Sequence, residues 1–100
     1  MARYDICELK KKGAYRLVVM LQADVLDSLP TRLIAPLVPA SSGQKATRLN
    51  PEFDVADKRM LMLTEQMVSV PSIVIGRVVG NVAEHDFEIG LALDMLLKGF

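Results

Sequence analysis

The sequence NVAEHDFEIGLALDMLLKGF, residues 81–100, has the features of a single helix. Asn81 is a good N-cap, and Glu84 stands three residues later, where its carboxylate can accept a hydrogen bond from the N–H of the cap residue. Lys98 lies at the negative end of the helix dipole, and Gly99 is of the type that usually ends a helix. The pattern therefore predicts a helix over residues 83–98.

The second half of this helix is apolar almost all round, with Asp94 as the interruption. Phe87, Leu91 and Met95 form one stripe at i, i+4 spacing, and further apolar residues widen it. A helix of this kind must be covered on more than one side. Two interpretations are open. The helix packs only into its own sheet, or it covers the sheet and also meets a second subunit.

The composition indicates a globular chain, because 51% of the residues are hydrophobic. Twelve basic and twelve acidic residues give a formal net charge of zero, which argues against a protein whose main task is to bind nucleic acid backbone. The one cysteine, Cys7, excludes an internal disulfide and fits a reducing compartment. With neither a signal peptide pattern nor a membrane-length apolar run, we expect a single domain over residues 1–100 in the cytoplasm.

Upstream of the helix, short apolar segments alternate with turn signals. Residues 14–22 are apolar on both faces in the middle and predict a central strand. Pro36 lacks an N–H, so its side of a strand should be an edge or a bulge. Further strands are expected over residues 2–9, 31–38, 52–55, 59–64 and 73–75. Residues 68–71 should be irregular or a turn, and residues 76–80 a link to the helix.

These five or six antiparallel strands and one helix predict a fold that is mainly β with a C-terminal α-helix. Because the loops are short, a curled antiparallel sheet or small SH3-like barrel is the natural closure, and it hides the edge strands. The helix would then plug or cover one side of the sheet.

Two segments between strands are open to a structural or a binding interpretation. Residues 23–30 carry Val25 and Leu26 between acidic residues, and this pair either folds back into the core or forms a small exposed patch for binding. The charge run Lys10, Lys11 and Lys12 is either a solvated hairpin tip or a contact for an acidic partner.

Catalytic and metal-binding patterns are weak. The only histidine, His85, is far from Cys7 and lacks ligand spacing, and it is expected on the surface of the first helical turn. No Gly-rich phosphate loop occurs. Four residues could form a phosphate-cleaving set, although the sequence does not place them together: Arg16, Arg32, Arg59 and Asp27. We therefore expect no metal, no cofactor and no enzymatic activity, and a binding protein instead.

Short segments in a fixed order run nearly from end to end of the chain. They are Tyr15-Arg16-Leu17-Val18-Val19, Gln22-Ala23-Asp24-Val25-Leu26-Asp27, Arg32, Pro36-Leu37, Met67-Val68-Ser69-Val70-Pro71, Ile75-Gly76 and the closing helix with Gly99 before a large apolar residue. In order, spacing and chain length these segments resemble the CcdB toxins. The Gln-x-Asp segment, the Ser-Val-Pro segment and the Gly-apolar terminus are the most specific parts.

The resemblance implies the toxin of a type II toxin–antitoxin module. Toxins of this kind are homodimers with a barrel-like antiparallel sheet and a C-terminal helix. They bind the A subunit of DNA gyrase, a topoisomerase, and trap it on cleaved DNA without catalytic activity of their own. A CcdA-like antitoxin neutralises them by wrapping the toxin with a disordered C-terminal segment. The resemblance implies neither direct nucleic acid binding nor a membrane partner.

Carried over residue by residue, the resemblance assigns gyrase binding to Val25, Leu26, Asp94, Lys98, Gly99 and Phe100. Lys98 stands where the family typically has Trp, and Asp94 stands where Asn is usual. Loss of a Trp anchor can cost on the order of 2–4 kcal/mol of binding free energy, and Phe100 offers a partial substitute. Charge complementarity alone assigns antitoxin binding to Lys10, Lys11 and Lys12.

Two alternatives stand beside gyrase poisoning. The MazF/Kid endoribonuclease toxins share a similar barrel, and fold alone does not decide function. Those enzymes usually begin with an Arg-Gly-Asp-like segment, whereas this chain has Arg3-Tyr4-Asp5-Ile6. RNA cleavage here would depend on an arginine such as Arg16 or Arg59. The other alternative is a dimeric protein of the CcdB fold that has lost gyrase poisoning.

Overall fold

The computed structural model describes residues 2–10, 13, 15–43 and 47–99. Its strands are β1 (Asp5–Leu9), β2 (Leu17–Met20), β3 (Thr31–Pro39), β4 (Glu52–Val55), β5 (Lys58–Met62), β6 (Val68–Pro71) and β7 (Ile75–Asn81). The helix α1 spans Asp86–Lys98, and short 3-10 helices are η1 (Asp24–Leu26), η2 (Ala40–Ser42), η3 (Thr64–Gln66), η4 (Ser72–Val74) and η5 (Ala83–His85).

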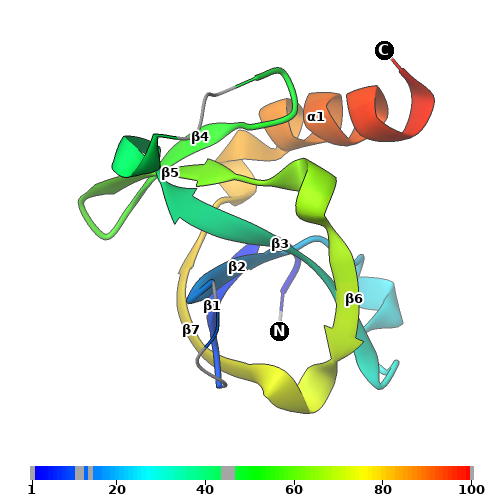
Figure 1. Cartoon of the computed structure of the whole chain (residues 1–100). Helices are drawn as coiled ribbons and strands as arrows, with labels where there is room; N and C mark the ends of the chain where they lie inside the picture. The colour runs from blue at the N-terminus through cyan, green and yellow to red at the C-terminus, as the bar shows by residue number, and fades with distance from the viewer. Residues whose placement is uncertain (1, 11–12, 14, 44–46, 100) are drawn as a thin grey trace.

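The strands form one curled antiparallel sheet in the order β4-β5-β3-β2-β1-β7, with β6 also pairing with β3. Figure 1 shows the strands curving round in a barrel-like arrangement, with α1 lying over the end formed by β4 and β5. The predicted fold class is confirmed. No helix within the described residues is long and apolar enough to cross a membrane.

The predicted central strand is confirmed, because β2 pairs with β1 on one side and with β3 on the other. Its side chains alternate between two apolar clusters. Val19 belongs to the main core with Phe53 and Ile89, whereas Val18 packs into a second cluster with Cys7. Burial on both faces explains why this strand has a nearly continuous apolar sequence.

Pro36 lies in the middle of β3, opposite Val18 of β2, and is buried. On its other side, β3 pairs with β6 as far as Ile34 and with β5 from Leu37 onward. The Pro36 carbonyl accepts a hydrogen bond from the Leu63 N–H at this changeover. The missing N–H of proline therefore falls where neither ladder pairs, which is the kind of irregularity that the sequence predicted.

The prediction for residues 68–80 is wrong in three places. Residues 68–71 form strand β6, residues 72–74 form η4, and the expected link at residues 76–80 is part of strand β7. Gly76 looked like a loop signal, but a Cβ at this position would lie 2.9 Å from the Glu8 carbonyl oxygen. The glycine allows β7 to approach β1 closely in a ladder that contains register shifts. The sheet accordingly has seven strands rather than five or six.

The C-terminal helix is shorter than predicted. Asn81 is the last residue of β7 and not the cap of a helix, since Val82 is the N-cap of η5; the Asn81 side-chain oxygen accepts a hydrogen bond from the Ala83 N–H at 2.7 Å. The α-helix begins at Asp86 and ends as predicted, with Gly99 left-handed at φ 84° and its N–H bonded to the Met95 carbonyl at 3.1 Å. The Glu84 carboxylate lies 3.8 Å from His85 Nε2, so the expected capping box is not the contact it makes.

Candidate functional site

The outward side of α1 carries large apolar side chains. Phe87 is 75% exposed and Leu91 54% exposed. At 3.6 residues per turn they share one row with Asp94 and Lys98, whose side chains form an ion pair at 3.5 Å. We call Phe87, Leu91, Asp94, Leu97 and Lys98 the α1 outer face. The opposite side buries Ile89 and Ala92, so this chain covers only one side of the helix.

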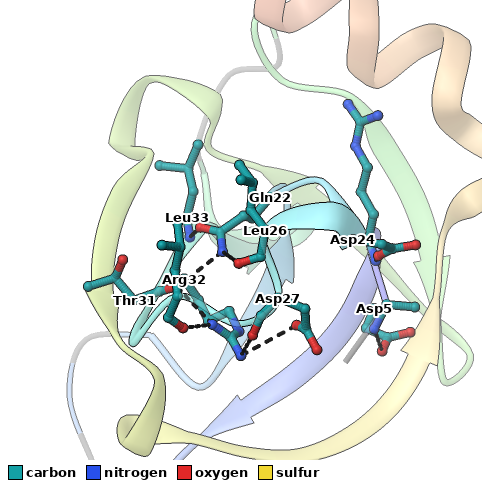
Figure 2. A network of polar contacts seen from close by, with 11 residues as sticks. Asp5, Gln22, Asp24, Leu26, Asp27, Thr31, Arg32 and Leu33 are labelled. Carbon is teal, nitrogen blue, oxygen red and sulfur yellow. Dashed lines mark hydrogen bonds and ion pairs between the residues drawn. The ribbon is translucent and has the colours of Figure 1, made fainter.

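The second exposed patch lies on residues 23–30, which we call the η1 loop. Val25 is 86% exposed and Leu26 46% exposed. The interpretation that this pair folds back into the core is therefore wrong. The pair is exposed, and its role in binding stays a prediction. Two polar residues that flank the loop contact its backbone instead: Gln22, just before it, and Arg32, in β3 (Figure 2).

The two patches are separate within one chain. Figure 1 shows η1, the cyan turn, beside β6, well away from the red C-terminal end of α1. The structure therefore divides the predicted gyrase-binding residues into Val25 and Leu26 on one side and Asp94, Lys98 and Gly99 on the other. Phe100 lies outside the described residues.

Of the three predicted antitoxin-binding lysines, only Lys10 belongs to the described residues. It is exposed, and its backbone N–H donates to the Val74 carbonyl at 2.9 Å. This contact fixes the backbone beside the second cluster and leaves the cationic side chain on the surface. Lys11 and Lys12 lie outside the described part of the chain.

The four residues considered for phosphate cleavage are not brought together. Arg32 is buried and pairs with Asp27 at 3.4 Å beneath the η1 loop. Arg59 is on the β4–β5 hairpin, where it lies 3.2 Å from Asp54. Arg16 is exposed and lines a groove with Leu37 and Met60, apart from the other three residues.

His85 is not the simple surface residue that was predicted. Its ring is half-buried and lies against the core residue Phe53, with ring centroids 4.8 Å apart. Its Nδ1 atom lies 2.8 Å from a Glu88 carboxylate oxygen. The contacts show a side chain that secures the start of α1 to the core. Among the described residues, no group of three or more His, Cys, Asp or Glu side chains could hold a metal ion.

Two grooves on the surface of the described residues were not predicted from the sequence. One, of about 350 Å³, is lined by Tyr15, Arg16, Leu17, Leu37, Val38, Pro39, Val55, Ala56, Lys58 and Met60. The other, of about 390 Å³, lies between α1 and the segment before β4 and is lined by Thr47, Arg48, Asn50, Pro51, Glu52, Glu88, Leu91 and Met95. Both are built from segments far apart in the sequence, so no local pattern marks them.

Solved structures that are similar to this chain include toxins. The chain is similar to the Mycobacterium tuberculosis toxin MazF-mt6, with a TM-score of 0.77 and 16% identity over 90% of this chain and 92% of that one. It is also similar to an endoribonuclease in complex with its cognate antitoxin from mycobacterial species. That match has a TM-score of 0.79 and 10% identity over 97% and 94% of the two chains. At these identities the likeness shows a shared fold.

The sequence profile of the CcdB protein family matches residues 3–99. The chain therefore belongs to the CcdB family, as the resemblance in its sequence indicated. This membership places it among the toxins of toxin–antitoxin modules.

The prediction that the protein is not an enzyme is contradicted by the structural comparison. It rested on weak catalytic patterns and on the resemblance to non-catalytic toxins. A solved structure that shares the fold over 97% of this chain is an endoribonuclease, so the architecture is one that supports RNA cleavage. Short local motifs could not show this, because fold and function vary independently.

Proposed function

We propose that this protein binds the A subunit of DNA gyrase and traps the gyrase–DNA cleavage complex. The observation that carries the proposal is the exposure of the residues that the family resemblance assigns to this task. In a chain whose CcdB match covers residues 3–99, Val25, Leu26, Lys98 and Gly99 are all exposed. Exposed aliphatic side chains on short, well-defined elements are suited to contact a protein target.

The α1 outer face supports the further proposal that the toxin is a homodimer. Phe87, Leu91 and Leu97 are exposed on a helix whose inner side is already packed on the core. A second copy of the chain that packs against these three apolar side chains would remove them from water, while Lys98 at the end of the helix is kept for the gyrase contact. The dimer would then present two helix ends and two η1 loops to gyrase. The target could contact both kinds of patch, although the two are separate within one chain.

An antitoxin of the CcdA type is the partner we propose for neutralisation. The structurally similar endoribonuclease was solved with its cognate antitoxin, which supports a partner of this kind. Lys10 is exposed. Arg16 and Lys58 together line the groove of about 350 Å³, so cationic groups are available to an acidic antitoxin segment. We propose the same role for Lys11 and Lys12.

Accumulation of cleaved DNA tests the gyrase proposal. Purified protein would be incubated with gyrase, ATP and supercoiled plasmid, and the reaction stopped with detergent and protease. We expect linear plasmid to accumulate with the wild-type protein and to fall markedly with the Val25→Asp variant. The Arg77→Ala variant is a matched control, because Arg77 lies on β7 and pairs with Glu8. Absence of linear plasmid with the folded wild-type protein would contradict the proposal.

RNA cleavage is the second candidate function. It is favoured by the endoribonuclease fold and by the exposure of Arg16 on a groove that Lys58 also lines. Purified protein would be incubated with a long single-stranded RNA, with Arg16→Ala and Arg59→Ala as variants. Cleavage that Arg16→Ala abolishes, without any effect on gyrase, would favour this function. Cleavage that persists equally in both variants would point to contamination.

A further inference from the structure

The η1 loop displays Val25 without support from the apolar core. None of the residues of η1 is buried, and the whole loop from residue 23 to residue 30 is exposed. Its own backbone bonds are short-range ones, such as that from the Leu26 N–H to the Ala23 carbonyl at 3.0 Å. Packing therefore does not fix this loop, and its shape must come from polar contacts with the neighbouring strands.

Gln22, which lies between the end of β2 at Met20 and the η1 loop, makes the first of these contacts. Its side-chain amide donates to the Leu26 carbonyl and to the Thr31 carbonyl, each at 3.1 Å. Its side-chain oxygen accepts a hydrogen bond from the Leu33 N–H at 3.2 Å. One side chain thus joins the middle of the η1 loop to Thr31 and Leu33 at the start of β3, as Figure 2 shows.

Arg32, in β3, contacts the second half of the η1 loop, residues 27–29. Its guanidinium donates to the carbonyls of Leu29, Thr31 (2.9 Å) and Asp27 (2.8 Å), and it lies 3.4 Å from the Asp27 carboxylate. The residue is only 8% exposed.

Burial of an arginine is costly unless its charge is compensated, and an apolar side chain of similar size often serves stability as well. Arg32 Nε is buried and has no hydrogen-bond partner among the described residues, which adds to that cost. Stability alone is therefore a poor reason for this arginine. Its distinctive property is that the planar fork reaches several loop carbonyls at once.

We propose that Gln22 and Arg32 are positioning residues for target binding. They hold the η1 loop in the conformation that presents the Val25 side chain to the protein partner. The inference rests on the proposed function and deepens it, because it separates the residue that contacts the target from those that shape the contact. A loop that is ordered before binding loses less conformational entropy on binding, so the clamp raises affinity without touching the target.

A thermodynamic cycle between Gln22 and Val25 tests the inference. Binding to the gyrase A subunit would be measured for wild type, Gln22→Ala, Val25→Ala and the double variant. We expect Gln22→Ala to weaken binding by about tenfold, as the loss of its hydrogen bonds to the loop and to β3 implies, and by less than about twofold once Val25 is already alanine. Arg32→Lys should weaken binding like Gln22→Ala, because one ammonium group cannot reach the same set of carbonyls.

Amide hydrogen exchange supplies the readout that a general loss of stability would not produce. In Gln22→Ala, the amides of residues 24–29 should exchange faster, as should that of Leu33, which loses its Gln22 acceptor, while the other amides of β2 and β3 are unchanged. Equal binding by wild type and Gln22→Ala, or additive effects in the cycle, would overturn the positioning role and leave the gyrase proposal standing. Failure of the wild-type protein to bind would instead overturn the proposed function itself, and this inference with it.

Discussion

The phenol hydroxyl of Tyr4 donates a hydrogen bond to the carboxylate of Asp86, the first residue of α1. The two residues are 82 positions apart, so this contact ties the start of β1 to the start of the C-terminal helix. Tyr4 is 5% exposed and has a left-handed backbone at φ 70°. The bond therefore fixes how the helix that carries the α1 outer face sits on the barrel.

Removal of this bond should destabilise the fold. We expect Tyr4→Phe to lower the free energy of unfolding by about 1–2 kcal/mol, since the hydroxyl bonds to an ionised group. Urea unfolding followed by circular dichroism measures the change. Asp86→Ala and the double variant complete a cycle, and their effects should be strongly non-additive. Fully additive losses would show that the two side chains do not act as a pair.

Stability should fall at alkaline pH. Burial, the largest cause, raises the pKa of Tyr4 from 10.0 to about 12, and it raises the pKa of Cys7 from 9.0 to about 11. Between pH 9 and 12 the unfolded chain thus loses protons that the folded chain retains, so the free energy of unfolding decreases as pH rises. Their contribution is fully present below pH 9. Urea midpoints at pH 8, 9.5 and 11 should show a decline that is shallower in Tyr4→Phe above pH 10, and equal declines would contradict the assignment.

Replacement by alanine should change the stability of the fold in opposite directions at Gly76 in β7 and at Gly90 in α1. Gly76→Ala places a Cβ 2.9 Å from the Glu8 carbonyl oxygen, so β1 and β7 must separate, at a cost of about 1–3 kcal/mol. Gly90 lies in α1 with no atom within 4 Å of an added Cβ. Gly90→Ala should therefore stabilise the helix by about 1 kcal/mol. Thermal unfolding of both variants decides the point, and a neutral Gly76→Ala would contradict the close approach.

The proposed homodimer depends on the α1 outer face. We expect Leu91→Lys to convert a dimer to a monomer at micromolar concentration, because it places a charge in an apolar contact. Sedimentation velocity measures the mass, and Val25→Lys serves as a surface control outside that face. A wild-type protein that is already monomeric at this concentration would refute the dimer.

The sequence predicted the elements whose pattern is strong and local. Val18, Val19 and Met20 are buried on both faces of β2, and Gly99 ends the last helix, so periodicity and capping were sufficient there. The prediction missed β7 because Gly76 and Gly80 are typical of a linking segment. Gly76 in fact allows β7 to approach β1 closely. Local patterns cannot distinguish these uses of glycine, since the contact is with a strand about 70 residues away.

The candidate site was predictable only as separate residues. The exposure of Val25 could not be decided from its sequence neighbours, because it depends on the conformation of the η1 loop, whose carbonyls Gln22 and Arg32 contact. Gln22 precedes the loop and Arg32 follows it in β3, and both act through hydrogen bonds to backbone carbonyls, which carry no sequence signal. Similarity to an endoribonuclease fold was expected only as an alternative, because short motifs do not decide between functions that share one barrel.

Direct binding to the gyrase A subunit tests the central claim most directly. The full-length protein would be titrated into the purified dimerisation region of that subunit by calorimetry, with Lys98→Ala, Val25→Asp and Arg77→Ala alongside. The account predicts wild-type binding that Val25→Asp reduces by at least about tenfold, that Lys98→Ala alters and that Arg77→Ala leaves unchanged. Absence of binding by the folded wild-type protein would contradict the claim, and RNA cleavage by the same sample would then establish the second candidate in its place.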